Sequence, residues 1–269
     1  MEKIKTIQDI QRMEQGILDY VANICEENEL RYFLAGGTLL GAIRHQGFIP
    51  WDNDIDISMP RPDYNKLISI VEKKPDERYR LLRVTNENDY YYPFIKVVDT
   101  KTKLIELARE DRIDDMGIFL DIFPLDTISK NHNKALRELR YVNKWGSRIA
   151  GSVSFPIGIS YFRKIEHYLW YWLLKMLNRE KSLNRVEKRL YAEKFGNTGY
   201  IVSTYGLRNE NEIIEYEAFA QTVELPFEGK MYKCPIGYDK YLKQMYGNYM
   251  ELPPERERIA PHDIEVYMD

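Results

Sequence analysis

Two aspartates at alternate positions are the first residues of this chain whose types and spacing could do chemistry. Asp54 and Asp56 alternate with Ile55 and Ile57. Because successive side chains of a β-strand point to opposite faces, the two carboxylates project together. Neighbouring carboxylates repel each other unless a cation lies between them, and Mg²⁺ or Mn²⁺ suits such hard oxygen ligands. We therefore expect Asp54 and Asp56 to bind a metal and to be catalytic.

A third carboxylate lies further along the chain, at Asp121. It is surrounded by apolar residues in the stretch 118–123, where a lone carboxylate is costly unless it has a partner. A third acid from a neighbouring strand would complete a two-metal site for phosphoryl chemistry. We therefore expect Asp121 to be a metal ligand and a catalytic residue. The alternative is a structural carboxylate that caps a turn near Pro124.

The acidic run has two other interpretations. Asp52, Asp54 and Asp56 have the spacing that begins a calcium-binding loop, but that loop needs glycine at its sixth position and glutamate at its twelfth. Those positions hold Ile57 and Asp63. A solvated acidic loop is the second alternative, and the interleaved isoleucines argue against it. We expect Asp52 to have a supporting position beside Asp54 and Asp56 and not to be the third acid of the site.

A double glycine precedes the aspartates. Gly36 and Gly37 lie between a predicted strand at 30–34 and a predicted helix at 38–45, and backbone amides at such a junction can bind an anion. A tight turn without a ligand is the alternative for an isolated glycine pair. Since the aspartates are close in sequence, we expect Gly36, Gly37 and Thr38 to bind substrate phosphate.

Charged and aromatic residues near these motifs are further candidates for substrate binding. Arg44, His45 and Lys96 could neutralise diphosphate oxygens, with ion pairs to local aspartates as the alternative. Trp51 is either a lid over a nucleotide or an anchor in the core. His262, in a proline-flanked tail, either closes over the site or has a surface role.

The elements that must position these residues form a mixture of helices and strands. Helices are predicted from Ile7 to Cys25 with Thr6 as N-cap, and after a cap at Asp63. Strands are predicted at 30–34, 55–59, 79–85, 93–98, 103–107 and 117–123, with a hairpin at 99–102 and strand ends at Pro60 and Pro124. This order indicates an α+β fold with a mixed β-sheet core flanked by helices.

Composition excludes several classes of protein. The 269 residues include 39 basic and 42 acidic ones, and a net charge of −3 argues against nucleic acid as a partner. Two cysteines and four scattered histidines argue against a Cys/His zinc site. The N-terminal residues lack an apolar signal-peptide core, and no apolar run is long enough to span a membrane. We expect a cytoplasmic protein.

The chain is predicted to divide into three parts. Residues 1–128 form a catalytic core, 129–200 a helical, aromatic and basic insertion, and 201–269 complete the core. Within 155–190, Trp170 and Trp172 suit a membrane interface, and anionic lipid could meet the basic residues that follow. Those residues are Lys175, Arg179, Lys181, Arg185, Lys188 and Arg189. A peripheral contact with the cytoplasmic face of a membrane is one interpretation, and a buried helix or dimer contact is the other.

The motif GGTLLGAIRHQGFIPWDNDIDI resembles LicD-type phosphocholine transferases of the nucleotidyltransferase fold, to which fukutin-related proteins are also similar. The resemblance extends to FIKVVDTKT around Lys96, to GIFLDIFPLD around Asp121, and to LPFEGKMYKCPIGYDKYLKQMYGNYMELPP. It covers most of the chain outside the insertion. One departure is Asn53, where the family usually has a further aspartate. Because Asn53 faces away from the aspartate pair, we expect little effect on metal binding.

The resemblance implies a reaction. Phosphocholine would pass from CDP-choline to a sugar hydroxyl of a cell-surface glycopolymer, of the teichoic acid or lipopolysaccharide type, or to its lipid-linked precursor. CMP would leave, Mg²⁺ or Mn²⁺ would be the cofactor, and Asp121 could be the general base. A quaternary ammonium prefers aromatic faces, and Tyr90–Tyr92 is one candidate cage. Alternatives are a nucleotidyltransferase that uses an NTP and a non-catalytic surface-polymer assembly factor.

Overall fold

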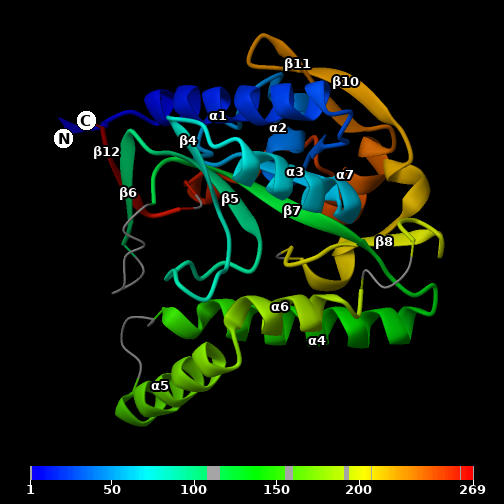
Figure 1. Ribbon diagram of the computed structural model, residues 1–269. Coiled ribbons are helices and arrows are strands. Elements are labelled where there is room, and N and C mark those ends of the chain that lie inside the picture. Colours follow the sequence, from blue (N-terminus) through cyan, green and yellow to red (C-terminus); the bar gives the residue numbers. More distant parts are fainter. Residues whose placement is uncertain are drawn as a thin grey trace.

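A mixed sheet of seven strands forms the centre of the molecule (Figure 1). The computed structural model describes residues 2–107, 116–154, 160–190, 194–206, 208–260 and 262–268. Five strands lie in the order β2, β3, β7, β5, β4, and β8 joins the far end of β7 and pairs with β9. Their bounds are β2 Phe33–Leu34, β3 Asp56–Pro60, β4 Tyr79–Leu82, β5 Ile95–Asp99, β7 Phe119–Thr127, β8 Tyr200–Ser203 and β9 Ile213–Glu215. The α+β class with a mixed sheet is confirmed.

Strand β7 is the central strand, and it is longer than predicted. It pairs in parallel with β3 and antiparallel with β5 and β8. The expected end at Pro124 was wrong, since β7 continues through Pro124 to Thr127. Proline lacks only the N–H group, and the Pro124 carbonyl accepts a hydrogen bond from the Thr204 N–H at 3.0 Å. One strand therefore connects the two ends of the sheet.

Four helices surround the sheet: α1 Ile7–Glu27, α2 Gly36–His45, α3 Arg61–Lys73 and α7 Tyr238–Tyr246. Helix α1 lies along the sheet (Figure 1) and begins at the predicted N-cap, because Thr6 Oγ1 accepts from the Asp9 N–H at 3.2 Å. Helix α2 begins at the double glycine itself. Asp63 is not a cap, as it lies in the first turn of α3 and pairs with Arg31 at 2.7 Å.

The predicted hairpin at 99–102 was wrong. Strand β6 (Thr102–Glu106) does not return alongside β5 but pairs with β12 (Ile264–Met268), which also pairs with β1 (Glu2–Lys3). A hydrogen bond of 2.8 Å from Thr102 Oγ1 to the Asp99 carbonyl turns the chain out of the main sheet. The two chain ends therefore lie side by side (Figure 1). A separate hairpin joins β10 (Thr222–Phe227) to β11 (Lys230–Pro235).

The stretch expected to be helical contains α4 (His132–Ala150), α5 (Tyr161–Met176) and α6 (Arg179–Glu187). Helices α4 and α6 lie together beside the sheet, and α5 projects from them (Figure 1). The inner faces of α4 and α6 join the main core through Leu139, Val142 and Leu183. The division of the chain into three parts stays a prediction. Within the described ranges, no helix has both the length and the apolar character needed to cross a membrane.

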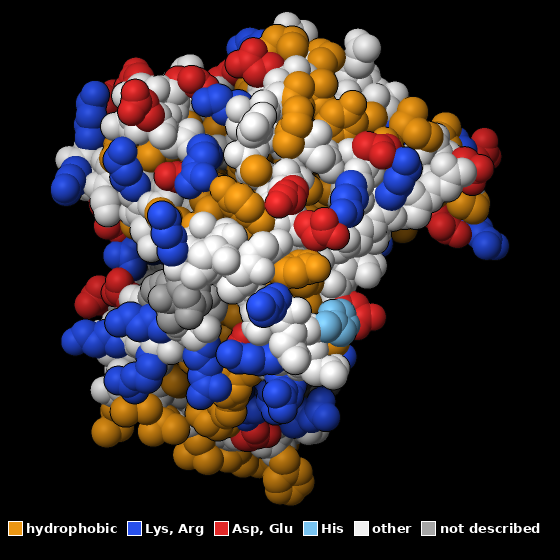
Figure 2. Space-filling model, turned by 90° about the vertical axis from the view of Figure 1, so that its right-hand side faces the viewer, with side chains coloured by type: hydrophobic (Ala, Val, Ile, Leu, Met, Phe, Trp, Pro, Cys, Tyr) orange, Lys and Arg blue, Asp and Glu red, His pale blue; other side chains and the backbone are white. Residues whose placement is uncertain are grey.

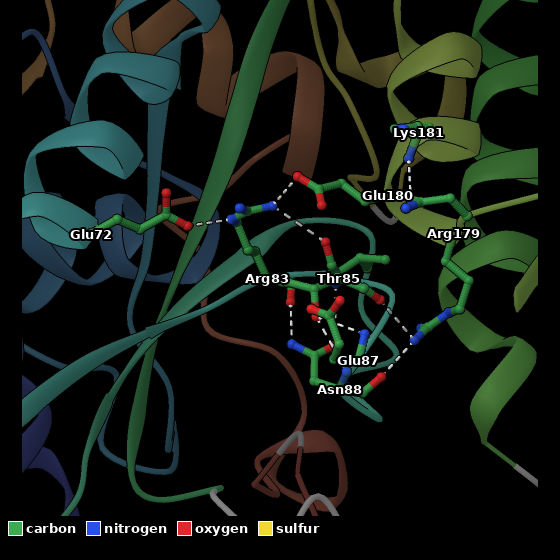
Figure 3. Close-up of polar contacts among 10 residues, drawn as sticks. Glu72, Arg83, Thr85, Glu87, Asn88, Arg179, Glu180 and Lys181 are labelled. Carbon is green, nitrogen blue, oxygen red and sulfur yellow. Dashed lines mark hydrogen bonds and ion pairs between the residues drawn. The ribbon is translucent and has the colours of Figure 1, made fainter.

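Buried and half-buried arginines attach these helices to the sheet. Arg61, at the start of α3, forms an ion pair with Asp126 of β7 at 2.5 Å and with Glu187 of α6 at 3.2 Å. On the neighbouring surface, Arg83 lies between Glu72 of α3 and Glu180 of α6, at 2.6 Å from each (Figure 3). Charged pairs thus fix α6 against α3.

Two residues expected at a membrane are placed differently. Arg179 is buried, and its guanidinium donates to the carbonyls of Thr85, Asn88, Tyr90 and Ala150 at 2.6–3.2 Å. Figure 3 shows the contacts to Thr85 and Asn88. A guanidinium without carboxylate partners needs such acceptors when it is desolvated, so lipid contact was wrong for Arg179. Trp170 turns inward, with its ring 5.9 Å from that of Trp145 and the Arg148 guanidinium 4.5 Å above it. Residues 155–159 of the expected contact lie outside the described residues.

Candidate active site

Three charged residues form a row across the centre of the sheet. In register, Asp56 of β3 lies opposite Asp121 of β7, and Asp121 lies opposite Lys96 of β5. Lys96 Nζ binds Asp121 Oδ1, and both side chains are buried. The expectation that a third acid lies on a strand beside Asp56 is confirmed. The apolar residues around Asp121 form the core, and Lys96 is its charge partner.

The double glycine brings the start of α2 against the carboxylates. A Cβ atom on Gly36 would lie 2.9 Å from Asp56 Oδ2, and one on Gly37 would lie 2.7 Å from Asp52 Oδ2. Gly36 also has a φ of +52°, which L side chains rarely adopt. Any larger side chain would push the acids away from the helix N-terminus. The Gly36 N–H donates to the Tyr241 hydroxyl at 3.3 Å, so phosphate binding by this pair stays a prediction.

Thr38 and His262 hold the aspartates from two sides. Thr38 Oγ1 accepts a hydrogen bond of 2.8 Å from the Asp56 N–H. His262 Nε2 lies 2.9 Å from Asp54 Oδ2, and Asp54 also shares a hydrogen bond with the Asp52 carboxyl. His262 therefore faces the site, and of its two sequence interpretations the structure favours the one in which it closes over the acids.

Glu14 is a site residue that sequence reasoning missed. It lies on α1, is 2% exposed, and its Oε2 atom has no hydrogen-bond partner. Its pKa is raised well above the usual range by burial and then by the charges of Asp54, Asp52 and Asp121. The available signal was a glutamate within an otherwise apolar helix face that includes Ile17.

The carboxylates are too close together for all of them to ionise easily. Burial, with help from Asp54, raises the pKa of Asp52 to about 8. Burial and then the neighbouring acids raise the pKa of Asp56 well above its usual range. Burial also raises the pKa of Asp121 to about 6 although Lys96 opposes this. For Asp54 burial is the largest single effect and acts in the same direction, but the hydrogen bond and charge of His262, the hydrogen bond with Asp52 and the charge of Lys96 together outweigh it and lower the pKa.

This donor set fits a hard divalent cation. All five acids offer oxygen, the ligand that Mg²⁺ prefers, and the unpartnered buried oxygen of Glu14 indicates missing positive charge. Lys96 and His262 supply positive charge beside Asp121 and Asp54. Among the described residues, no three Asp, Glu, His or Cys side chains are already arranged as a set of metal ligands. Asp54, Asp56 and Asp121 remain our proposed ligands.

Comparisons with known proteins identify the family of this chain. The family described as "LicD/FKTN/FKRP, nucleotidyltransferase domain" matches residues 29–156. Over 280 aligned residues the chain is 30% identical to the "Lipopolysaccharide cholinephosphotransferase LicD" of Haemophilus influenzae, and the alignment spans all of both proteins. The chain belongs to the LicD family. It is accordingly an enzyme of the phosphotransferase kind.

A shorter match reaches animal proteins. Over 40 residues the chain is 50% identical to the human and mouse proteins named "Ribitol 5-phosphate transferase FKRP". The aligned segment covers 15% of this chain and 8% of each of those proteins. Such a short alignment supports family membership and carries nothing about the substrate of this LicD-family chain.

Arg44 and His45 lie at the other end of α2 from the glycines. Gly37 and Arg44 are seven positions apart in the helix, which is about 10 Å along the axis. Arg44 Nη1 donates to the carbonyls of Tyr249 at 3.1 Å and Glu251 at 3.3 Å, and its Nε donates to His45 Nε2 at 3.0 Å. Backbone carbonyls are thus its partners here. Substrate binding by Arg44 and His45 stays a prediction for this family member.

Trp51 is half-buried near the acids and packs against the core. The guanidinium of Arg258 lies 5.7 Å from the centre of its ring. Both sequence interpretations, a lid over a nucleotide and a core anchor, therefore stay open. Its position leaves one face towards the C-terminal segment that also carries His262.

The tyrosine triplet has mostly structural contacts. Tyr90 is buried and donates to the Phe94 carbonyl at 2.9 Å, while the hydroxyls of Tyr91 and Tyr92 both bind the Glu106 carboxylate. An aromatic box does surround a cation nearby, but that cation is Lys96. Its ammonium lies 3.4, 4.4 and 5.4 Å from the ring centres of Phe119, Tyr92 and Phe94. A choline cage in the triplet stays a prediction.

Proposed function

We propose that this LicD-family enzyme transfers phosphocholine from CDP-choline to a sugar hydroxyl of a cell-surface glycopolymer or its lipid-linked precursor, and releases CMP. The transferred group and the class of acceptor are inferred from the full-length similarity to a lipopolysaccharide cholinephosphotransferase, and CDP-choline as the donor is what the LicD resemblance of the sequence implies. The observation that carries the chemistry is the row of Asp56, Asp121 and Lys96 beside the N-terminus of α2. An anionic phosphate ester and a divalent cation are the ligands that this arrangement suits.

The proposed reaction is an in-line displacement at phosphorus. The acceptor hydroxyl oxygen forms a bond to the choline-bearing phosphorus, and the bond from that phosphorus to the CMP oxygen breaks with its electron pair leaving on CMP. The hydroxyl proton passes to the Asp121 carboxylate, which Lys96 holds in position. The start of α2 stabilises phosphate charge through its dipole. A bound Mg²⁺, held by Asp54, Asp56 and Asp121, would neutralise charge on the phosphate oxygens.

The test is product analysis with purified protein. CDP-choline, CDP-ethanolamine and CTP are each incubated with and without Mg²⁺ and a glycolipid extract, and CMP and pyrophosphate are measured by chromatography. We expect CMP from CDP-choline with Mg²⁺, and loss of at least about 10²-fold of this rate in Asp56→Asn. Asp63→Asn is the matched control, because Asp63 pairs with Arg31 outside the cluster.

Two outcomes would contradict the proposal. Pyrophosphate released from CTP, with no CMP from CDP-choline, would indicate a nucleotidyltransferase. CMP release by Asp56→Asn at the wild-type rate would remove the carboxylate row from the mechanism.

A further inference from the structure

Helix α5 presents an apolar face to solvent. Six of its large hydrophobic side chains are more than half exposed, with Phe162 at 82% and Met176 at 84%. They are Tyr161, Phe162, Tyr168, Leu169, Trp172 and Met176. At 3.6 residues per turn these positions fall within about 120° of the helix circumference. The exposed side chains therefore form one continuous stripe, and scattered surface hydrophobics would not do so.

The opposite face of α5 fixes this orientation. Leu174 is buried, and Trp170 packs on the ring of Trp145 with the Arg148 guanidinium above it. A second tie is the ion pair of 2.5 Å between Arg148 of α4 and Glu166 of α5. Because these contacts use the inward face, the same packing that holds the helix leaves the apolar stripe exposed to solvent.

The surrounding charge is strongly positive. Residues 132–190 contain thirteen Lys or Arg and four Glu, a formal net charge of +9, in a chain whose total is −3. Figure 2 shows Lys and Arg side chains gathered in a band low on the molecule, with hydrophobic side chains forming the lower end below them, at the height of α5 in Figure 1. Apolar tips below a basic band complement an anionic lipid surface, in which acyl chains lie beneath negative head groups.

A basic cavity opens between α4 and α5 beside the stripe. Its volume is about 360 Å³, and its lining includes Lys144, Arg163, His167 and Trp170. The one acid in the lining, Glu166, is neutralised by Arg148. Lys144 and Arg163 remain as the cations that could meet a phosphate, with Trp170 as an apolar wall. The cavity suits the phosphate of a lipid head group.

We propose that α5 docks the protein on a bilayer that contains anionic lipid, with the stripe in the head-group region and the cavity taking a lipid phosphate. A second copy of the chain is the other candidate occupant of the stripe. Charge argues against it, because two +9 segments would face each other across such a dimer. Docking would place the enzyme where a lipid-linked acceptor lies, but it does not depend on which group is transferred.

Co-sedimentation with vesicles tests the proposal. Wild-type protein should pellet with vesicles of equal parts phosphatidylglycerol and phosphatidylcholine, and about 0.5 M NaCl should release it. The double variant Phe162→Ser/Trp172→Ser should bind at least about tenfold more weakly, with unchanged CMP release on a soluble acceptor. The control Met231→Ser/Met250→Ser removes two exposed methionines elsewhere and should bind like wild type.

Charge reversal tests the cavity separately. Lys144→Glu/Arg163→Glu should also lower affinity for the anionic vesicles by at least about tenfold. Equal pelleting of wild type and both double variants would overturn the proposal. So would a wild-type dimer in sedimentation velocity that Phe162→Ser/Trp172→Ser converts to monomer when the wild type fails to bind vesicles.

Discussion

Asn53 holds the backbone of His262 through two hydrogen bonds. Its Nδ2 donates to the His262 carbonyl at 3.0 Å, and the His262 N–H donates to its Oδ1 at 3.3 Å. A carboxylate could accept but not donate, so the aspartate that the LicD resemblance led us to expect at position 53 could not make both hydrogen bonds. This contact positions the imidazole that meets Asp54.

Asn53→Ala should therefore destabilise the fold. The Asn53 side chain is 4% exposed, and its loss leaves the partly buried N–H and carbonyl of His262 without these partners, which costs about 1–3 kcal/mol. Urea denaturation measures the change, with Asn65→Ala on the exposed side of α3 as the matched control. If both variants unfold at the wild-type midpoint, the Asn53 contact contributes nothing.

The catalytic strands could be predicted from sequence because their signal is local. Alternation places Asp56 on one face of β3, and the apolar residues around Asp121 predict a buried partner. Lys96, which supplies that partner, was predicted as a ligand for phosphate with an ion pair to a local aspartate as the alternative, and the structure has the ion pair with Asp121. The placement on adjacent strands follows from register, and register follows from the hydrophobic pattern.

Other contacts could not be predicted because they join distant parts of the chain. His262 reaches Asp54 only after β12 has paired with β6 and β1. Arg179 looks like a surface residue in a basic run, and only the packing of α6 against the loop after β4 buries it. Long-range pairing of this kind has no periodic signature in sequence.

Arg179→Lys should lower thermal stability. The guanidinium serves four carbonyls in a fixed fork, as Figure 3 shows for the loop at Thr85 and Asn88, whereas an ammonium has three donors and a different geometry. A loss of about 1–3 kcal/mol would lower the melting temperature by several degrees. Calorimetry checks this against Arg185→Lys, an exposed position on the same helix. Equal melting temperatures would contradict the inferred role.

Glu212 should make stability depend on pH. Burial raises its pKa to about 7, although the Arg208 N–H, donating at 3.2 Å, opposes the shift. Because the folded state binds this proton more tightly than the unfolded one, the contribution to stability is present below about pH 4.5 and is lost as pH rises through about 7. The loss is up to about 3 kcal/mol.

Glu212→Gln removes this titration, so the difference in unfolding free energy between variant and wild type should move in favour of the variant between pH 5 and pH 8 or so. Chemical denaturation across that range measures it, with exposed Glu210→Gln as the control. A difference that stays constant with pH would mean that Glu212 ionises as it does in the unfolded chain.

Asp56→Asn should stabilise the metal-free protein although it abolishes activity. Burial and the neighbouring acids raise the pKa of Asp56 well above its usual range, so the folded state opposes ionisation of this group at neutral pH. An amide has the same shape but no charge, so the folded variant does not bear the cost of a buried ionised group at this position. In the presence of a chelator we expect the variant to gain about 1 kcal/mol or more at pH 7.5, and less at pH 5.

Magnesium should reverse this order of stability, so that the wild type becomes more stable than Asp56→Asn. A cation among the carboxylates relieves their repulsion, and a ligand that binds only the folded state raises its stability by mass action. Mg²⁺ should therefore raise the melting temperature of wild type and of Asp63→Asn, but leave Asp56→Asn almost unchanged. Differential scanning fluorimetry with EDTA and with Mg²⁺ measures both effects. Asp56→Asn could instead melt below wild type in EDTA, with Mg²⁺ changing the melting temperature of neither protein. Other groups of the protein, and not a metal, would then balance the negative charge of the acids.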